Sequence, residues 1–135
     1  MKELNIILVY DKNRENILMC KRTKPPYKGK LNLVGGKIEK DEDHLEAAYR
    51  ELKEESGILK NDICLKKFMT FYYDIPKINL EVYVGVLNKD IVLLPEINPL
   101  FWVRISENFF NLDKFAGEGN IGHIIEEIKL YKDIF

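Results

Sequence analysis

The sequence predicts an α/β fold, a mixed β-sheet with about three helices. Short runs of branched apolar residues alternate with polar turns along most of the chain, which is typical of strands. Two longer stretches instead carry apolar residues at helical spacing. With 135 residues, of which 46% are hydrophobic and 32% charged, the chain has the make-up of one domain with its own core. We therefore expect a single domain over residues 1–135.

The first third of the chain carries strand signals. The apolar segment Leu4–Tyr10, a polar turn over 11–16 and a second apolar run, Ile17–Cys20, predict a strand, a turn and a strand. Two prolines, a glycine and several cationic side chains then predict an irregular loop over 21–30. A short strand, Leu31–Val34, is expected to lead into a glycine turn.

A helix is expected after the glycine pair at 35–36. Asp41 or Asp43 can cap its start, and the helix continues to about Ser56. Gly57 is well placed to end it in the left-handed conformation. One face of this helix is apolar and comprises Leu45, Ala48, Tyr49 and Leu52.

The second half of the chain predicts a hairpin and a further strand. Ile63–Tyr73 and Ile78–Leu87 are strand-like and are joined by a proline-containing turn over 74–77. Phe101–Ile105 is the further strand.

Two helices are predicted in the tail. A short helix over Glu107–Phe115 is followed by a glycine-rich turn, and apolar residues at helical spacing then predict a helix over Ile121–Tyr131.

Composition argues against several classes of partner. Lys and Arg together number 21 and Asp and Glu 22, so a net charge of -1 provides no overall basic field for nucleic acid or a membrane surface. Cys20 and Cys64 form no CxxC pair, and the start of the chain lacks the apolar run of a signal peptide. We expect a reduced, cytoplasmic protein without a stable nucleic-acid or membrane partner. The oligomeric state stays open.

Three carboxylates share one face of the central helix: Glu51, Glu54 and Glu55. Like charges at this spacing destabilise a helix by roughly 0.2 to 0.5 kcal/mol per pair. Arg50 can relieve part of the repulsion, and a hard divalent cation with oxygen ligands would relieve more, which points to magnesium or manganese. A solvated acidic helix face is the plain alternative.

The string from Gly36 to Ile58, GKIEKDEDHLEAAYRELKEESGI, resembles the signature of the Nudix hydrolases, G-x5-E-x7-R-E-U-x-E-E-x-G-U, where U is bulky and apolar. The matching positions are Gly36, Glu42, Arg50, Glu51, Leu52, Glu54, Glu55, Gly57 and Ile58. Nine specified positions in one window form a far more specific motif than a lone glycine pattern. The resemblance implies an α/β/α sandwich in which the signature forms a loop, a helix and a loop.

The resemblance also implies a metal site. Glu51, Glu54 and Glu55 would bind Mg²⁺ (or Mn²⁺) with the Gly35 carbonyl. Glu51 or Glu54 would act as the catalytic carboxylate on the attacking water. Glu96, in PEINPLFW, resembles the distant carboxylate that relatives acting on nucleoside triphosphates add as a metal ligand or base.

Two side chains of the signature would brace the site. By the same resemblance, Glu42 and Arg50 would hold the loop against the helix.

Substrate recognition is expected from residues around the signature. Asn32 and Asn120 resemble the asparagines with which relatives face an oxidised purine, although Asn120 can equally cap the last helix. Arg22 and Lys21, at the end of a predicted strand, could reach the polyphosphate, and Gly36 and Lys37 of the signature loop would help to hold it.

An aromatic side chain can stack the base, and the candidates are Phe71, Phe101 and Trp102. His44 and His123 lack any metal-ligand spacing and receive no role.

The leading hypothesis is hydrolysis of a nucleoside triphosphate, such as an 8-oxo purine nucleotide (8-oxo-dGTP), to the monophosphate and pyrophosphate. A second hypothesis is cleavage of ADP-ribose or a dinucleoside polyphosphate. A third is a nucleotide-binding module without turnover, although this chain retains all the signature carboxylates.

Overall fold

The computed structural model describes residues 1–131 and 134. Its helices and strands are β1 (Lys2–Tyr10), β2 (Asn16–Lys21), β3 (Leu31–Asn32), β4 (Val34–Lys37), α1 (His44–Ser56), β5 (Lys66–Tyr73), β6 (Ile78–Val86), β7 (Leu100–Arg104) and α2 (Asn120–Lys129).

The strands form one mixed sheet centred on β1. Strand β1 pairs in parallel with β6 along its whole length and antiparallel with β4 and β2 on its other side. The hairpin partner β5 closes one edge, and β7 pairs antiparallel with β2. Since β1 is paired with neighbours on both sides, its apolar run over residues 6–10 is what a central strand requires.

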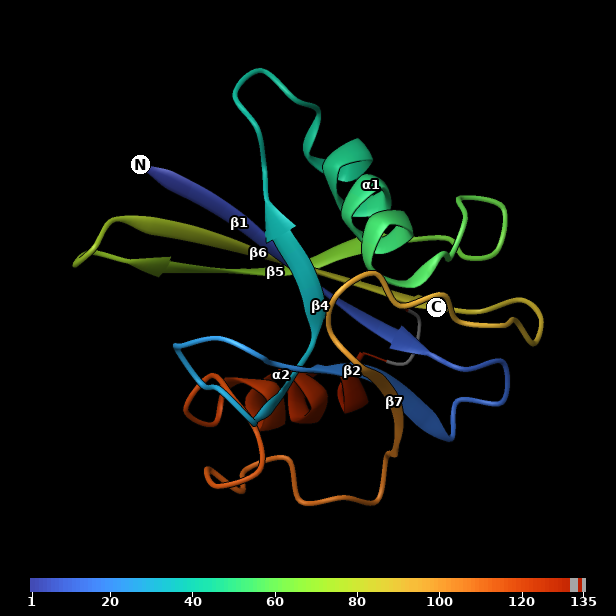
Figure 1. Cartoon of the computed structure of the whole chain (residues 1–135). Helices are drawn as coiled ribbons and strands as arrows, with labels where there is room; N and C mark the ends of the chain where they lie inside the picture. Colours follow the sequence, from blue (N-terminus) through green and yellow to red (C-terminus); the bar gives the residue numbers. More distant parts are fainter. Residues whose placement is uncertain (132–133, 135) are drawn as a thin grey trace.

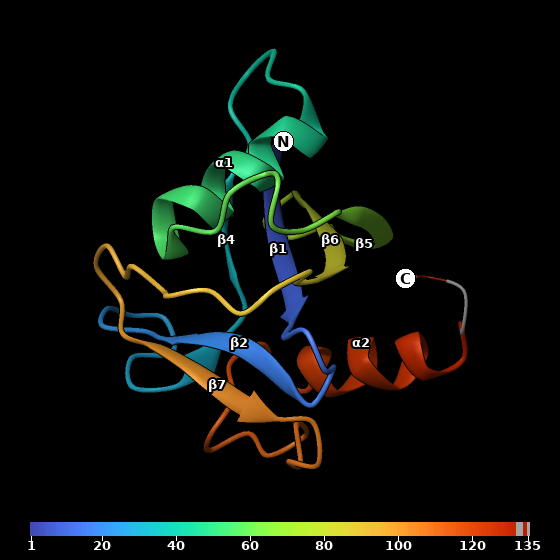
Figure 2. The ribbon, with the colours of Figure 1, turned by 90° about the vertical axis from the view of Figure 1, so that its right-hand side faces the viewer.

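Alternate residues of β1 face two separate cores. Leu8 and Tyr10 pack in the core that contains the apolar face of α2, whereas Ile7 and Val9 pack in the core that contains α1. The two helices accordingly lie on opposite faces of the sheet (Figures 1 and 2). The predicted α/β/α sandwich is confirmed.

Helix α1 begins and ends where the sequence predicts. The Asp43 carboxylate accepts a hydrogen bond from the backbone N–H of Glu46, and this satisfies one free donor of the first turn. Gly57 adopts φ 79°, and its N–H donates to the Lys53 carbonyl. Leu52 is fully buried on the face that packs against the sheet.

The strand predicted at Leu31–Val34 is in fact two strands. Residues 31–32 pair with β2, and β4 then pairs with β1, with Gly35 opposite Ile6. The glycine pair therefore lies within a strand, not in a turn. Gly35 has φ +153°, and a Cβ there would lie 2.2 Å from the Asn5 carbonyl oxygen, so only glycine lets the two strands pair this closely.

The short helix predicted over Glu107–Phe115 does not form, and this prediction was wrong. Asn108 and Asn111 each accept a hydrogen bond from the backbone N–H two residues later. These local turns compete with helical hydrogen bonding. The tail thus contributes one helix, α2, and no helix in the described residues meets the length and apolar content that a bilayer crossing needs.

The strands of the predicted hairpin do form, as β5 and β6. The first begins at Lys66, since Ile63 makes only an isolated bridge.

Candidate active site

Four carboxylates line one small cavity at the end of α1. Glu51, Glu54 and Glu55 come from the helix, and Glu96 comes from the segment before β7. Ile97, Asn98 and Leu100 complete the walls of a space of about 130 Å³. We call this cavity the carboxylate pocket.

Backbone contacts place Glu96 in the carboxylate pocket. The N–H of Leu94 donates to the carbonyl of Ser56 at the end of α1, with 2.8 Å between the atoms. On the other side of Glu96, the Pro99 carbonyl accepts a hydrogen bond from the N–H of Lys21 at 2.9 Å. The segment is therefore held at both ends, and the predicted meeting of Glu96 with the helical carboxylates takes place.

The signature glycine makes room for a carboxylate. A Cβ on Gly36 would lie 2.4 Å from the Glu51 carboxyl carbon, so this side chain lies directly over the glycine. The N–H of Gly36 donates to the buried side-chain oxygen of Asn5 at 3.0 Å. Sequence reasoning missed Asn5, although a lone polar residue inside an apolar strand was a visible signal.

Arg50 ties the signature loop to the helix. Its Nε and Nη2 donate to the two oxygens of Glu42 at 2.6 and 2.9 Å, and Nη2 also donates to the Lys37 carbonyl. This fork is the geometry that only a guanidinium provides. It lowers the pKa of Glu42 to about 2. Arg50 also reaches Glu51 at 3.1 Å and Glu54 at 3.3 Å, through Nη1.

Burial and like charge disfavour ionisation in the carboxylate pocket. The pKa of Glu55 is raised to about 7, first by burial and then by the charges of Glu51, Glu96 and Glu54, while the Gly35 N–H that it accepts opposes the change. Burial also raises the pKa of Glu51, against the effect of Arg50. The carboxylate pocket therefore holds more negative charge than the neighbouring Arg50 guanidinium can balance.

The match with known proteins explains this arrangement. The family model of the NUDIX domain matches residues 3–121. The chain belongs to the Nudix family. It is thus a Nudix hydrolase of pyrophosphate linkages, and hydrolases of this family use divalent metal ions.

Solved structures share the fold of this Nudix domain. An Ap4A hydrolase from C. elegans is 20% identical with a TM-score of 0.74, and the match covers 98% of this chain and 99% of that one. A MutT, described for Aliivibrio salmonicida and Vibrio cholerae, is 21% identical with a TM-score of 0.71, over 96% and 98% of the two chains.

A larger protein contains the same fold. A bifunctional NMN adenylyltransferase/ADP ribose pyrophosphatase from Francisella tularensis, complexed with AMP and a manganese ion, is 23% identical with a TM-score of 0.74. The match covers 96% of this chain and 41% of that one. At these identities the likeness establishes the fold.

The residues of the carboxylate pocket fit a hard divalent cation. Every charged donor in its lining is a carboxylate oxygen, the ligand that magnesium and manganese prefer. A cation there would also offset the like charges that raise the pKa of Glu55. The like charges therefore favour a bound cation, and the oxygen ligands favour a hard one.

None of the predicted polyphosphate contacts, Lys21, Arg22, Gly36 and Lys37, is in the lining of the carboxylate pocket. The Nε of Arg22 donates to the Pro26 carbonyl at 2.7 Å within the cationic loop. Lys37 follows Gly36 at the end of β4, and its side chain is exposed.

The two predicted base contacts have partners of their own. The side-chain oxygen of Asn32 accepts from the N–H of Leu33 at 2.8 Å. The amide of Asn120 donates to the Tyr73 hydroxyl at 2.7 Å and makes no cap for α2. Neither asparagine lines the carboxylate pocket.

His44 has a structural contact that the sequence did not reveal. Its ring nitrogens lie 2.7 Å from Glu81 and 3.1 Å from Glu3, and the Tyr83 hydroxyl donates to Glu81 at 2.7 Å. Burial would raise the pKa of Glu81, but these partners and Lys67 lower it. The cluster has the composition of a metal site. Because the His44 ring contacts both carboxylates and Lys67 lies 3.6 Å from Glu81, the cluster anchors the start of α1 to β1 and β6.

Proposed function

We propose that this Nudix domain hydrolyses a nucleoside triphosphate to the monophosphate and pyrophosphate. The main support for the proposal is the carboxylate pocket, which is lined by four carboxylates. One of them, Glu55, has a pKa raised to about 7 by burial and by the charges of the others. Such crowding is costly unless a cation binds there. An oxidised purine such as that of 8-oxo-dGTP is the base that we propose.

In the proposed reaction, water attacks a phosphorus, the bridging P–O bond breaks, and pyrophosphate leaves. Mg²⁺ or Mn²⁺ bound by Glu51, Glu54, Glu55, Glu96 and the Gly35 carbonyl would neutralise phosphate oxygens and lower the pKa of water. Glu51 or Glu54 accepts the proton of the attacking water. Burial of Glu51 favours proton uptake because it raises the pKa of this carboxylate.

Recognition is proposed to use residues on the strands and loops beside the carboxylate pocket. Arg22 and Lys37 would pair with phosphate oxygens, and Gly36, whose missing side chain leaves room for the Glu51 carboxylate, would hold the polyphosphate beside that carboxylate. Asn32 and Asn120 would face the base, where an amide offers a donor and an acceptor. The hydrogen bond between Asn120 and the Tyr73 hydroxyl would hold the amide in place.

Cleavage of ADP-ribose or of a dinucleoside polyphosphate is the second candidate. Two solved structures of the same fold favour this candidate. One is an Ap4A hydrolase, and the other is a bifunctional protein described as an NMN adenylyltransferase/ADP ribose pyrophosphatase. The chemistry at the carboxylate pocket would be the same, so the surrounding loops would select between these substrates.

We further propose that the chain works as one domain in the cytoplasm and without a stable nucleic-acid or membrane partner. The net charge of -1 and the two free thiols, Cys20 and Cys64, support this setting.

A substrate panel tests the proposed function. Normal and oxidised nucleoside triphosphates, ADP-ribose and dinucleoside polyphosphates are each incubated with the protein and magnesium or manganese, and the products are separated. Pyrophosphate from a triphosphate supports the proposal, and monophosphates from the other substrates would move the specificity to the second candidate. Binding without turnover across the panel would favour a nucleotide-binding module.

The variant Glu54→Gln is the control for this panel. Glu54 is half exposed and pairs only weakly with Arg50, so the fold should tolerate the change. Turnover should vanish, while the melting temperature stays within a few degrees of the parent protein.

A further inference from the structure

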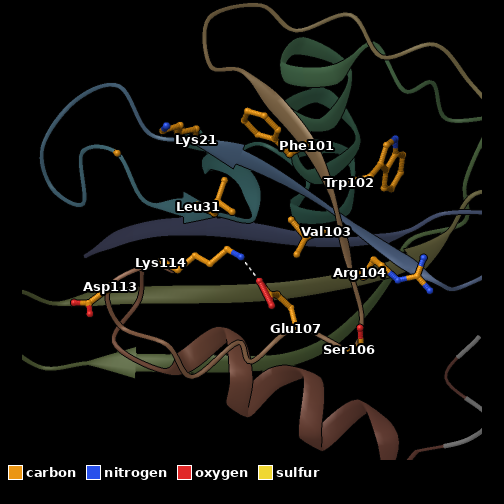
Figure 3. Close-up of a pocket in the computed structure, with 11 residues that line it drawn as sticks. Lys21, Leu31, Phe101, Trp102, Val103, Arg104, Ser106, Glu107, Asp113 and Lys114 are labelled. Atoms are coloured by element: carbon orange, nitrogen blue, oxygen red, sulfur yellow. Dashed lines mark hydrogen bonds and ion pairs between the residues drawn. The ribbon is translucent and has the colours of Figure 1, made fainter.

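We propose that a second cavity, on the sheet face opposite the carboxylate pocket, binds an aromatic group joined to phosphate, such as a nucleoside 5′-monophosphate. This cavity lies along β7 (Figure 3), and we call it the β7 cavity. The proposal goes beyond the proposed function, because it concerns binding and requires no turnover.

The volumes of the two cavities decide which of them can hold a nucleoside. The carboxylate pocket has about 130 Å³, whereas the β7 cavity has about 760 Å³. Sites for small molecules usually measure about 300 to 1,000 Å³. The carboxylate pocket therefore suits phosphate groups and an ion, and of these two cavities the β7 cavity is the one with room for a base and a sugar.

An aromatic ring and an apolar floor suit a planar base. Phe101 is 45% exposed although it lies within a strand. Figure 3 shows it on one rim of the β7 cavity, with Leu31 and Val103 between this rim and the opposite one. An exposed aromatic ring gives a base a flat surface to stack on, because every base has a π-face.

The charges of the β7 cavity are unequal at its two rims. Lys21 lies beside Phe101, and no carboxylate pairs with its ammonium group in the part of the chain that the structure describes. On the opposite rim, Lys114 is held by an ion pair with Glu107, and Asp113 lies next to it. A phosphate would be attracted to Lys21, while the two carboxylates can accept hydrogen bonds from the amino or hydroxyl groups of a nucleoside.

The β7 cavity and the carboxylate pocket lie on the two faces of the same stretch of chain, at the start of β7. Leu100 lines the carboxylate pocket and the next residue, Phe101, lines the β7 cavity, because successive side chains of a strand point to opposite faces. The bound group therefore has two possible sources. It is the far end of a polyphosphate whose middle lies among the carboxylates, or it is a free mononucleotide.

Binding of AMP to the full chain tests the proposal without any reaction. Amide signals are followed by NMR during a titration, and the dissociation constant is measured by calorimetry. We expect AMP to shift the signals of Leu31, Phe101 and Val103, and Phe101→Ala to weaken binding at least fivefold. The parent protein should bind AMP more tightly than adenosine, which lacks the phosphate. Lys21→Ala should make the two affinities equal.

A matched control separates stacking from general disturbance. Phe110 is 50% exposed and lies outside the β7 cavity, so Phe110→Ala should leave the affinity for AMP unchanged. Equal effects of the two alanine variants, or AMP-induced shifts confined to the signals of α1, would overturn the proposal. Both variants are compared with the parent protein in thermal unfolding. If Phe101→Ala lowers stability, Phe101→Tyr replaces it in the test, and this variant should bind AMP like the parent protein because it keeps the aromatic ring.

Competition in the inactive Glu54→Gln variant distinguishes the two sources. If the β7 cavity serves the far end of a substrate, diadenosine tetraphosphate should displace AMP at a concentration at least tenfold lower than AMP itself needs. If it serves a free mononucleotide, the two should compete equally, and both outcomes support the site. Failure of the substrate panel together with Phe101-dependent AMP binding would remove the proposed function and leave the β7 cavity in place.

Discussion

Gly36→Ala is the substitution that separates the chemistry from the fold most sharply. The new Cβ would lie 2.4 Å from the Glu51 carboxyl carbon and 2.5 and 2.6 Å from its oxygens, where ordinary contact begins at 3.4 Å. The carboxylate must therefore move by about 1 Å, and a shift of this size in a catalytic group costs about 100-fold in rate. That corresponds to about 2.7 kcal/mol of transition-state stabilisation.

The fold should tolerate Gly36→Ala because the crowded atoms belong to the end of a flexible side chain. We expect the free energy of unfolding, measured in urea, to change by less than about 1 kcal/mol. Gly35→Ala is the matched contrast: its Cβ would lie 2.2 Å from the Asn5 carbonyl oxygen, so β4 must separate from β1. We expect Gly35→Ala to lower the free energy of unfolding by about 3 kcal/mol or more.

The assay for Gly36→Ala is metal-dependent product release from the best substrate of the panel, at saturating and subsaturating substrate. The contact between Glu51 and Gly36 would have no catalytic role if Gly36→Ala kept its rate within about threefold of the parent. A loss of stability as large as that of Gly35→Ala would show that the two glycines serve only strand pairing.

Three further predictions follow from the same geometry. Because Glu55 has a pKa raised from 4.5 to about 7, its contribution to stability is complete below pH 4.5 and is lost as pH rises through 7; in metal-free protein the melting temperature should fall over this interval, and Glu55→Gln or added magnesium should flatten the fall. Arg50→Lys should lose the two-pronged contact with Glu42, and its effects on rate and unfolding should be much less than additive with those of Glu42→Gln in a double-mutant cycle. Asn5→Ala should lower the free energy of unfolding by about 1 to 3 kcal/mol and also reduce the rate, because the N–H of Gly36 loses its buried acceptor; an unchanged urea midpoint would contradict this.

Local signals in the sequence predicted α1 and its surroundings well. The Asp43 cap, the left-handed Gly57 and the apolar face around Leu52 are each decided within one or two turns of helix, so spacing alone specifies them. The hairpin of β5 and β6 likewise depends on a short turn between apolar runs.

Long-range pairing could not be predicted in the same way. Gly35 and Gly36 have the composition of a turn, and they lie in β4 because β1 offers a partner strand more than twenty residues away. The failed helix after β7 has a different cause. Its asparagines satisfy their own backbone, and propensity over a short window does not capture that competition.

The carboxylate pocket was partly visible in the sequence. The helical carboxylates follow from periodicity, and Glu96 could be named only through the family resemblance, because a loop's position depends on contacts such as that between Leu94 and Ser56. The roles of these residues as ligands and catalysts stay predictions. Phe101 was a candidate for stacking a base, but the β7 cavity itself could not be located from the sequence, since Lys21 and Phe101 come from different strands that only pairing brings together.

The proposed hydrolysis of a diphosphate in the carboxylate pocket depends on a divalent cation. The most direct test measures the hydrolysis rate of one nucleotide substrate against magnesium concentration, for the parent protein and Glu54→Gln side by side. We expect a saturating rise for the parent protein, no turnover in excess chelator, and a loss of at least about 100-fold in Glu54→Gln. Turnover that persists without metal, or a Glu54→Gln variant as active as the parent, would contradict this proposal.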